Sequence, residues 1–333
     1  MTGNVLLSSA GRRVALLRAF RASLRELSSD GMVIAADASP LSAAFHAADR
    51  AVVVPRCISE EFVPALLEVC RLHDVRLIVP TIDTELAVLA AHRGTFADAG
   101  VIVAISDPET VDVGADKLRT NEWLVANGFP TVRQARPDAV LGRGDGWRYP
   151  LVVKPRRGSA SIGVTTVGSA DELDLVADAD VVVEEVARGH EYTVDVFADR
   201  SGRARCAVPR RRLEVRSGEV SKGVTVRCPL LQQLACRVVE ALPGAYGALN
   251  VQVFLDADEK QPRIIEINPR FGGGFPLSWE AGAPFPRWLL EDGAGLSPSA
   301  VADEWRDGVV MLRYDDAIFV DASDVGLGQG SGR

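Results

Sequence analysis

The first hundred residues alternate short apolar runs with stretches long enough to form a helix, and this alternation limits the fold more than any other feature. Residues 14–27 repeat apolar side chains at spacings of three and four, which is typical of a helix that buries one face. The apolar runs between such stretches are Val5–Leu7, Met32–Ala36, Ala51–Val54, Leu77–Val79 and Val101–Ile105. Strands that alternate with helices pair in parallel. We therefore expect a doubly wound α/β sheet.

The pattern changes near residue 114. Residues 116–127 are typical of a short helix that ends at Asn127, Gly128 and Pro130. Residues 136–148 are polar and rich in Gly and Arg, so we expect a loop there. Further strand runs follow with turns between them: Leu151–Lys154, Val181–Glu185, Tyr192–Phe197, Val251–Leu255 and Arg263–Ile267. This favours an antiparallel sheet with helices, an α+β part. The Gly-rich end, residues 321–333, predicts disorder.

Composition and charge narrow the class of protein. The chain has 333 residues, 47% of them apolar, and a formal net charge of −8, which excludes a disordered or fibrous chain and disfavours binding to nucleic acid or membranes through overall charge. Five scattered cysteines suit a reducing compartment. With no apolar stretch of membrane-spanning length, we expect a cytoplasmic protein without export signal or anchor. The four histidines share no metal-ligand spacing, so a metal would need oxygen ligands.

The segment from Val152 to Val164 is typical of a phosphate-binding loop. Lys154 ends a strand run, and small residues follow it: Gly158, Ser159, Ser161 and Gly163. Such a loop exposes backbone N–H groups to a phosphate, and a lysine on the adjoining strand supplies a positive charge. The spacing is not that of a Walker A loop. A glycine hairpin beside a lysine is the alternative.

The segment from Arg263 to Phe275 carries oxygen ligands. Glu266 and Asn268 are two residues apart on a predicted strand, so both side chains leave the same face, and Arg270 follows where the strand ends. Antiparallel pairing with the preceding strand run can add Gln252. Carboxylate and amide oxygens suit magnesium, which completes its shell with waters and substrate phosphates. The alternative is a strand that turns polar residues to solvent.

A third segment, from Val181 to Phe197, leaves one strand at Glu184, Glu185 and Val186, turns at Gly189 and resumes as an alternating strand. The extended backbone after the first strand offers the donor and acceptor pair that an adenine edge requires. A plain hairpin with an acidic turn is the alternative interpretation.

Together and in this order, these segments resemble the ATP-grasp superfamily, with the nearest likeness to stand-alone carboxylate-amine ligases of the carbamoyl-phosphate synthase large-subunit type. The motifs are K-P-R-x-G-S-x-S-x-G-V from Lys154, E-E-V from Glu184, N-V-Q ending at Gln252 and E-I-N-P-R from Glu266. The resemblance implies a pre-ATP-grasp α/β domain over residues 1–113 and an ATP-grasp fold of two α+β subdomains over residues 114–320, with a lid over about residues 130–186.

The resemblance also implies roles for the nucleotide-binding residues. Lys117 and Lys154 would contact the nucleotide, and the loop Gly158–Gly163 would cover its β and γ phosphates. Glu184 would accept from the adenine amino group while the Glu185 and Val186 backbone reads the ring edge. Glu191 would hold the ribose hydroxyls.

For the metal and the reacting groups, the resemblance implies magnesium ligation by Gln252, Glu266 and Asn268 and contact of Arg270 with the transferring phosphoryl group. The cofactors would be ATP and Mg²⁺, with Mn²⁺ able to substitute. Many relatives have an acidic residue in place of Gln252, so one metal position is weakened.

An arginine-rich stretch follows the third segment: Arg203, Arg205, Arg210, Arg211, Arg212 and Arg216. Within an ATP-grasp domain, Arg211 and Arg212 are our candidates to hold an anionic substrate or acyl-phosphate, together with Lys222 as a further contact to the bound anions. A nucleic-acid patch is disfavoured, because no aromatic residues are interleaved. A solvated arginine-rich hairpin is the remaining alternative.

Two turns of the first part are candidate substrate contacts. Gly11 lies between a strand and a helix, where free N–H groups favour an anion, and Thr81, Asp83 and Glu85 follow the strand Leu77–Val79 at the sheet edge where ligands collect. The alternatives are a structural turn and a capped helix start with favourable first-turn acids.

The implied activity is the two-step joining of a small, amino-acid-like carboxylate to an amine through an acyl-phosphate, with release of ADP and phosphate. Its partners would be these small molecules, with a homodimer as the expected assembly. An inactive ATP-binding regulatory protein and a carbamate- or carboxy-phosphate-forming enzyme are alternatives. A dehydrogenase built on the first part is a third, although the G-x-G-x-x-G spacing is missing around Gly11, with Asp37 where a ribose carboxylate would stand.

Overall fold

The computed structural model describes residues 3–27, 30–143, 146–158, 162–177, 179–256 and 261–327. Its front part is a parallel sheet of five strands in the order β3-β2-β1-β4-β5. The strands are β1 (Asn4–Ser8), β2 (Val33–Asp37), β3 (Arg50–Val53), β4 (Val75–Pro80) and β5 (Ile102–Val103). The helices are α1 (Val14–Glu26), α2 (Ala43–Ala47), α3 (Phe62–Leu72), α4 (Asp83–Ala91), α5 (Arg93–Asp98) and α6 (Pro108–Ala115).

Both faces of this front sheet are covered, as expected for a doubly wound sheet. Val5 and Leu7 pack in the same core cluster as Phe20 of α1, whereas Leu6 packs in a second cluster with Leu66 of α3. Successive strand residues point to opposite faces, so a continuous apolar strand needs helices on both sides. The predicted α/β fold is confirmed here.

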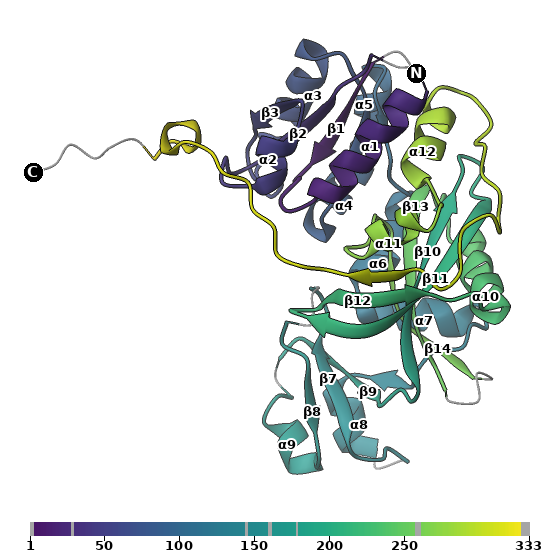
Figure 1. Cartoon of the computed structure of the whole chain (residues 1–333). Coiled ribbons are helices and arrows are strands. Elements are labelled where there is room, and N and C mark those ends of the chain that lie inside the picture. Colours follow the sequence, from purple (N-terminus) through teal and green to yellow (C-terminus); the bar gives the residue numbers. More distant parts are fainter. Residues whose placement is uncertain are drawn as a thin grey trace, which may run out of the picture.

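A second, smaller sheet has the order β6-β9-β7-β8, and all its pairs are antiparallel. Its strands are β6 (Gln134–Ala135), β7 (Leu151–Pro155), β8 (Thr165–Val167) and β9 (Val181–Glu185), and the nearby helices are α7 (Lys117–Ala126), α8 (Pro137–Arg143) and α9 (Ala170–Asp174). We call this sheet with α8 and α9 the lid (Figure 1).

The predicted loop over residues 136–148 is wrong for its first half, because α8 forms there. Pro137 stands at the helix start, where a missing N–H is not needed, and Asp138 lies in the first turn. Val140 is buried in the lid core beside Leu151 and Val183. Tertiary packing of this apolar side chain outweighs the polar composition of the segment.

The third sheet is antiparallel with six strands in the order β14-β13-β10-β11-β12-β15. The strands are β10 (His190–Ala198), β11 (Ala204–Arg216), β12 (Glu219–Thr225), β13 (Gly247–Leu255), β14 (Pro262–Asn268) and β15 (Val310–Leu312). The remaining helices are α10 (Pro229–Ala241), α11 (Phe275–Glu280), α12 (Phe285–Gly293) and a short 3₁₀ helix (Ala322–Val325). The expected antiparallel α+β part is therefore confirmed.

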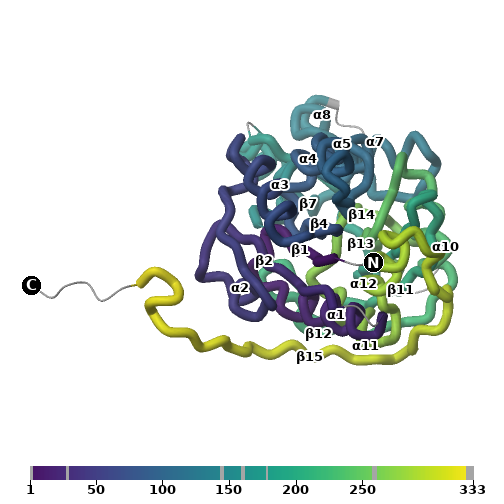
Figure 2. The backbone as a smooth tube through the Cα atoms, turned by 90° about the horizontal axis from the view of Figure 1, so that it is seen from above, coloured from purple at the N-terminus to yellow at the C-terminus, as the bar shows by residue number. Residues whose placement is uncertain are grey.

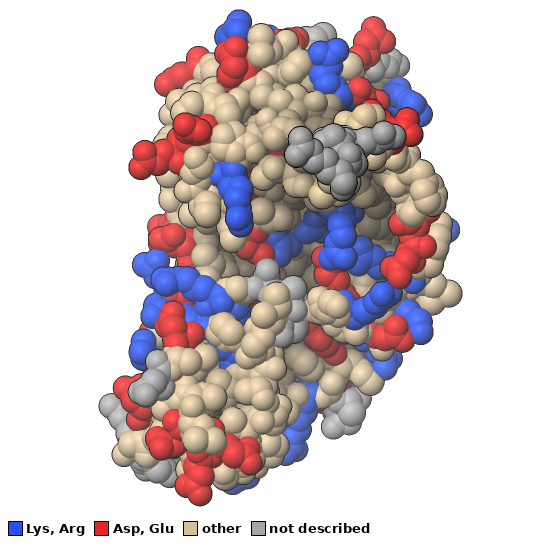
Figure 3. Space-filling view, turned by 90° about the vertical axis from the view of Figure 1, so that its left-hand side faces the viewer, with Lys and Arg blue, Asp and Glu red and all other residues tan. Residues whose placement is uncertain are grey.

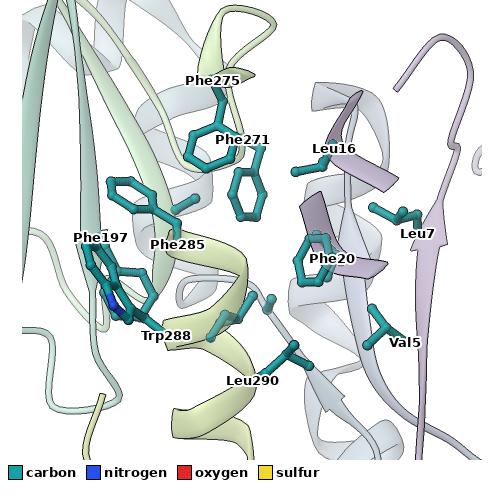
Figure 4. Packing of buried hydrophobic residues seen from close by; sticks show 14 of the residues in the cluster. Val5, Leu7, Leu16, Phe20, Phe197, Phe271, Phe275, Phe285, Trp288 and Leu290 are labelled. Carbon is teal, nitrogen blue, oxygen red and sulfur yellow. The ribbon is translucent and has the colours of Figure 1, made fainter. Parts of the chain in front are cut away.

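One aromatic core joins the front sheet to the six-stranded sheet (Figure 4). Phe20 of α1 meets Phe271 edge-on, with ring centroids 5.9 Å apart, and Phe271 meets Phe275 at 4.8 Å. Phe285 and Trp288 of α12 continue the cluster. Each buried aromatic side chain contributes about 1.5–3 kcal/mol, so this core fixes the two sheets relative to each other.

Three features bear on the predicted boundaries. Helix α6 runs across residues 113 and 114, so the division into two domains there stays a prediction. Of the tail predicted to be disordered, residues 322–325 form an exposed 3₁₀ turn, and residues 328–333 lie outside the described residues. Within the described part of the chain, no helix combines the length and apolar character that crossing a membrane requires.

Candidate active site

Three adjoining cavities run from the lid to the front sheet. The lid cavity, of about 360 Å³, lies between the lid and the six-stranded sheet. The central cavity, of about 310 Å³, shares Arg212, Gly218, Gln252 and Glu266 with it. The front cavity, of about 270 Å³, lies against the Ser9–Arg13 turn and shares Arg13 and Glu219 with the central cavity. The series therefore forms one continuous cleft, and Lys and Arg side chains gather in the hollow between the lid and the front part (Figure 3).

In the lid cavity, Lys154 and Glu184 form a buried ion pair. Their strands β7 and β9 are antiparallel neighbours with Val152 opposite Glu184, so the two side chains are diagonal on one face. Lys154 Nζ lies 2.7 Å from Glu184 Oε2, and Gln134 Nε2 donates to Glu184 Oε1 at 2.6 Å. A buried carboxylate with two partners is held in a fixed orientation. Residues predicted to hold phosphate and adenine therefore meet in one cavity.

A second lysine faces the same cavity. Lys117, at the start of α7, donates from Nζ to the Gly158 carbonyl oxygen at 2.8 Å. Burial lowers the pKa of Lys117, and the positive charge of Lys154 adds to this effect, while Glu266 opposes it. The positive charges of the two lysines repel each other, and a bound polyanion would relieve this repulsion. A nucleotide triphosphate has the required charge.

Some of the other residues predicted to bind the nucleotide line the lid cavity, and others do not. Glu185 and Val186 line the lid cavity, as does Glu191. Glu191 Oε1 lies 3.0 Å from Arg212 Nη1. Burial nevertheless raises the pKa of Glu191. Gly163 is not a lining residue of any of the three cavities. Ser159 and Ser161 lie outside the described residues.

The predicted metal ligands lie on the wall between the lid and central cavities. Gln252 of β13 is directly opposite Glu266 of β14, and Asn268 lines the central cavity on the same strand. Gln252 Oε1 accepts from Arg212 Nη1 at 3.2 Å, and Asn268 Oδ1 from Arg270 Nη2 at 3.5 Å. Within the described ranges, the Glu266 carboxylate has neither a hydrogen bond nor an ion pair.

This donor set fits a hard divalent cation. No group of three or more His, Cys, Asp or Glu side chains in the described part of the chain is placed to hold a metal, so amide oxygens would have to contribute. One free carboxylate with two amide oxygens matches the preference of magnesium for oxygen, and the remaining positions suit waters and phosphates.

Arg270 bridges the front sheet and the six-stranded sheet. Its Nε and Nη2 donate to the two Asp83 oxygens at 2.6 and 2.8 Å, across 187 positions of sequence. Bidentate pairs of this kind are strong and directional. Asp83, expected to face substrate, therefore lies at the cleft but holds Arg270.

Four arginines line the central cavity: Arg13, Arg210, Arg212 and Arg270. Arg210 is almost fully buried, and its Nε and Nη2 donate to Asp195 at 2.7 and 2.9 Å. From the sequence, Arg210 belongs to the arginine-rich stretch but is not among the chosen candidates, and Arg13 has no predicted role. A strand period of two would have revealed Arg210, because it shares a face of β11 with Arg212.

The same period excludes Arg211 from the cleft. It points to the other face of β11, where its Nη2 lies 2.9 Å from His190 Nε2. Lys222 is also misplaced by the prediction: its Nζ donates to Glu214 at 2.7 Å on the exposed hairpin of β11 and β12, and it lines none of the three cavities. Bulges in this hairpin shift its register beyond residue 212, which the sequence pattern does not reveal.

At the front sheet, the residues predicted to contact substrate instead make hydrogen bonds within the protein. Glu85 is fully buried and accepts from Ser8, Ser9 and the Thr81 backbone N–H, so it does not face a ligand. Burial raises the pKa of Glu85, although these hydrogen bonds lower it in part. Thr81 lines the cleft, but its hydroxyl donates to the Ser8 and Ser9 carbonyl oxygens.

The Gly11 turn also differs from expectation. Gly11 lines the front cavity, but its N–H donates to Asp37 Oδ2 at 2.7 Å. The protein's own carboxylate thus takes the position predicted for a bound anion. Asp37 is occupied in the same contact, which removes the ribose-binding residue that a dinucleotide site would need.

Comparisons with known proteins agree with this arrangement. A family model of the PylC-like N-terminal domain matches residues 5–104, one described as ATP-grasp in the biosynthetic pathway with Ter operon matches residues 177–316, and one of the D-ala D-ala ligase C-terminus matches residues 131–215.

Among curated relatives, a D-alanine–D-alanine ligase of Methylibium petroleiphilum is 30% identical over 183 residues, which cover 47% of this chain and 57% of the relative. One of Corynebacterium aurimucosum is 28% identical over 233 residues, covering 62% and 65%. The chain thus spans less than two thirds of the length of these relatives.

Solved structures resemble the whole fold. The biotin carboxylase domain of 2-oxoglutarate carboxylase from Hydrogenobacter thermophilus, solved with MgADP and bicarbonate, has a TM-score of 0.73 at 17% identity and covers 93% of this chain and 74% of that one. N5-carboxyaminoimidazole synthetase from Staphylococcus aureus has a TM-score of 0.69 at 16% identity, covering 89% and 78%. Residues 177–316 therefore match an ATP-grasp family model, and the overall fold of the chain is that of these solved structures.

Proposed function

We propose that this chain is an ATP-dependent ligase that activates a small carboxylate as an acyl-phosphate and joins it to an amine, releasing ADP and phosphate. One observation carries the proposal. The cavity that holds the buried Lys154 and the half-buried Lys117 meets the cavity with four arginines at a wall where the Glu266 carboxylate makes no hydrogen bond or ion pair to a described residue. Such a junction can bring together a triphosphate, a divalent cation and a carboxylate.

In the lid cavity, ATP would place its phosphates near Lys117 and Lys154 and its adenine near Glu184 and the backbone of Glu185 and Val186. Apolar side chains such as Ile162 and Phe254 line the same cavity and suit the flat faces of the base. Glu191 would hold the ribose. The flap residues Gly158–Gly163 would close over the phosphates.

Gln252, Glu266 and Asn268 would hold Mg²⁺, with Mn²⁺ as a substitute. The bound cation would neutralise charge on the phosphates and orient them. With one carboxylate in the set, we propose one tightly bound metal ion.

The chain aligns reactants rather than forming a covalent bond to them. A substrate carboxylate oxygen attacks the γ-phosphorus, the bond to the β-phosphate oxygen breaks, and ADP leaves. Arg270, which Asp83 holds in place, would donate to the transferring phosphoryl oxygens, and Arg212 is the second candidate. An amine then attacks the acyl carbon and phosphate departs.

The names of similar proteins support this choice of reaction. The relatives are D-alanine–D-alanine ligases, and among the structural neighbours are N5-carboxyaminoimidazole synthetases. Small, amino-acid-like substrates, a cytoplasmic location and a homodimer belong to the same proposal. The five free thiols suit a reducing compartment.

Hydroxylamine trapping tests the proposal. A panel of carboxylic acids is incubated with the protein, ATP, Mg²⁺ and hydroxylamine, and hydroxamate and ADP are measured. We expect at least one acid to give hydroxamate and ADP in equal amounts. ATP binding without carboxylate-dependent ADP release across the panel would instead favour a regulatory protein.

A further inference from the structure

A half-buried glutamine lies behind the wall of the lid cavity, and the chemistry proposed above gives it no role. Gln134 of β6 is directly opposite Glu184 of β9 in an antiparallel pair. Side chains directly opposite each other leave the same face of a sheet. Gln134 lines none of the three cavities. Its effect on a ligand in the lid cavity would therefore pass through Glu184.

The contact between these two side chains is short. Gln134 Nε2 donates to Glu184 Oε1 at 2.6 Å, while Lys154 Nζ lies 2.7 Å from Glu184 Oε2. Each carboxylate oxygen thus has its own partner. Glu184 is buried, so rotation of its carboxylate would break both contacts inside the protein, where water does not replace them.

The amide of Gln134 is held in one orientation. Its Nε2 must face the carboxylate, because an amide oxygen there would repel it. This leaves Oε1 buried without a hydrogen-bond partner in the part of the chain that the structure describes. A buried acceptor without a partner costs stability. Such a cost is typical of functional sites rather than of contacts that only stabilise a fold.

Binding of a nucleotide would change the partners of Glu184. Under the proposed function, Lys154 contacts the phosphates, which draw its positive charge away from Glu184. The strand order β6-β9-β7 places Gln134 on the other side of Glu184 from Lys154. Gln134 is then the contact that keeps the carboxylate in place.

We propose that Gln134 is a positioning residue that makes the lid cavity select a purine with an amino group at C6. A fixed Glu184 carboxylate accepts from that amino group, whereas it repels the carbonyl oxygen that hypoxanthine and guanine carry there. Without Gln134 the carboxylate can rotate away from such an oxygen, and the difference between the two kinds of base shrinks. The inference rests on the proposed function and adds the residue that sets base preference.

Gln134 can be changed without touching the reacting groups. Helix α8, which follows β6, lies on the side of the lid away from β12 and β15 (Figures 1 and 2). Arg212 of β11 and Arg270, which follows β14, belong to the six-stranded sheet and its edge. Base recognition can therefore be measured separately from phosphoryl transfer.

The experiment measures nucleotide binding to the full chain by isothermal titration calorimetry, with Mg²⁺ and without a carboxylate substrate. The ligands are ATP, ITP, which has the carbonyl oxygen at C6, and inorganic tripolyphosphate, which has no base. Gln134→Leu keeps the approximate size of the side chain and removes the donor. Gln232→Leu is the matched control, because Gln232 Nε2 also donates to a carboxylate, Asp303 Oδ1 at 3.0 Å, but lines none of the three cavities.

We expect the parent protein to bind ATP more tightly than ITP. Gln134→Leu should lower this preference about tenfold by weakening ATP binding, as loss of one hydrogen bond to a charged group does. Its affinity for tripolyphosphate should stay unchanged, which a collapsed lid would not allow. Gln232→Leu should match the parent protein with all three ligands.

Three results would overturn the inference while hydroxamate formation still supports the ligase. They are an unchanged preference for ATP in Gln134→Leu, an equal loss of ATP and tripolyphosphate affinity in that variant, and equal affinities of the parent protein for ATP and ITP. Absence of ATP binding by the parent protein would overturn the proposed function, and this inference with it.

Discussion

At the scale of single residues, the cleft depends on a few charged side chains with fixed partners. The pairs Lys154–Glu184 and Arg270–Asp83 are both short and partly or fully buried. Their partners orient them before any ligand arrives, which reduces the reorganisation that binding and reaction require. Substitutions at these positions should therefore affect the chemistry more than those of exposed pairs.

Arg270→Ala should lower kcat by about three orders of magnitude, because phosphoryl-stabilising arginines have effects of that size. Steady-state ADP release with the acid found by trapping measures it. Arg71→Ala, which removes an exposed pair with Glu68, is the control. Turnover within about threefold of the parent protein would remove Arg270 from this role.

Lys154→Ala should weaken ATP binding about 10- to 150-fold, equivalent to about 1.5–3 kcal/mol, through loss of a charge-assisted contact. Isothermal titration calorimetry with a non-hydrolysable ATP analogue measures the change. Lys222→Ala is the comparison, because its side chain lies on the exposed hairpin. Unchanged affinity in Lys154→Ala, or an equal loss in Lys222→Ala, would contradict the placement.

The sequence predicted these residues unevenly, and the reasons are physical. Glu266 and Asn268 lie two apart on one strand, and a period of two places both on the same face. Arg211 does not line the cleft, because a period of two places Arg210 and Arg212 together on the opposite face of the strand. The bond between Asp83 and Arg270 joins residues far apart in the chain, and local patterns contain no such information.

At the scale of elements, α7 links the lid to the rest of the molecule through its first turn. Asp116 caps the helix by accepting from the Leu118 and Arg119 N–H groups. The same carboxylate accepts from Arg156 Nε at 2.8 and 2.9 Å, just after β7. One side chain thus fixes both the helix that carries Lys117 and the strand that carries Lys154.

Asp116→Asn should lower the free energy of unfolding by about 1–3 kcal/mol at neutral pH. Although burial opposes it, contacts with Arg156 and the helix N–H groups lower the pKa of Asp116. Such a carboxylate stabilises the fold above the ordinary aspartate pKa, and this contribution is lost as the pH falls below it. Urea unfolding across this range checks the prediction, and a difference between the variants that does not shrink on acidification would contradict it.

Elements with strong local patterns were predictable and the others were not. The strands of the front sheet read as continuous apolar runs because helices cover both faces. Helix α8 was not predicted because its segment is mostly polar and the helix depends on the burial of one apolar side chain, Val140. The long strand β11 was not predicted as a strand because Arg210 is paired with Asp195 inside the protein rather than solvated.

At the scale of the whole molecule, the lid is the least anchored part. Among the described residues, the lid core holds six buried apolar side chains, whereas the front and six-stranded sheets share the large aromatic core. Small cores open at lower free energy than large ones. We therefore expect the lid to open at a lower free energy than the rest of the molecule, which would admit a nucleotide to the cleft.

Amide hydrogen exchange should show this difference. Amides of β7 and β9 should exchange through a lower-energy opening than those of β1 and β4, and a non-hydrolysable ATP analogue with Mg²⁺ should slow exchange in the lid strands selectively. Equal protection of all four strands, or protection by the analogue at the Gly11 turn instead, would contradict the account.

The central claim is that a nucleotide triphosphate lies in the lid cavity with its phosphates on the Glu266 wall. The most direct measurement is a crystal structure of the full chain with a non-hydrolysable ATP analogue and Mn²⁺, located by anomalous scattering. We predict an anomalous peak within bonding distance of Glu266 and Asn268 oxygens and a phosphate near Lys154 Nζ. A nucleotide bound at the front sheet, with no metal at Glu266, would contradict the claim.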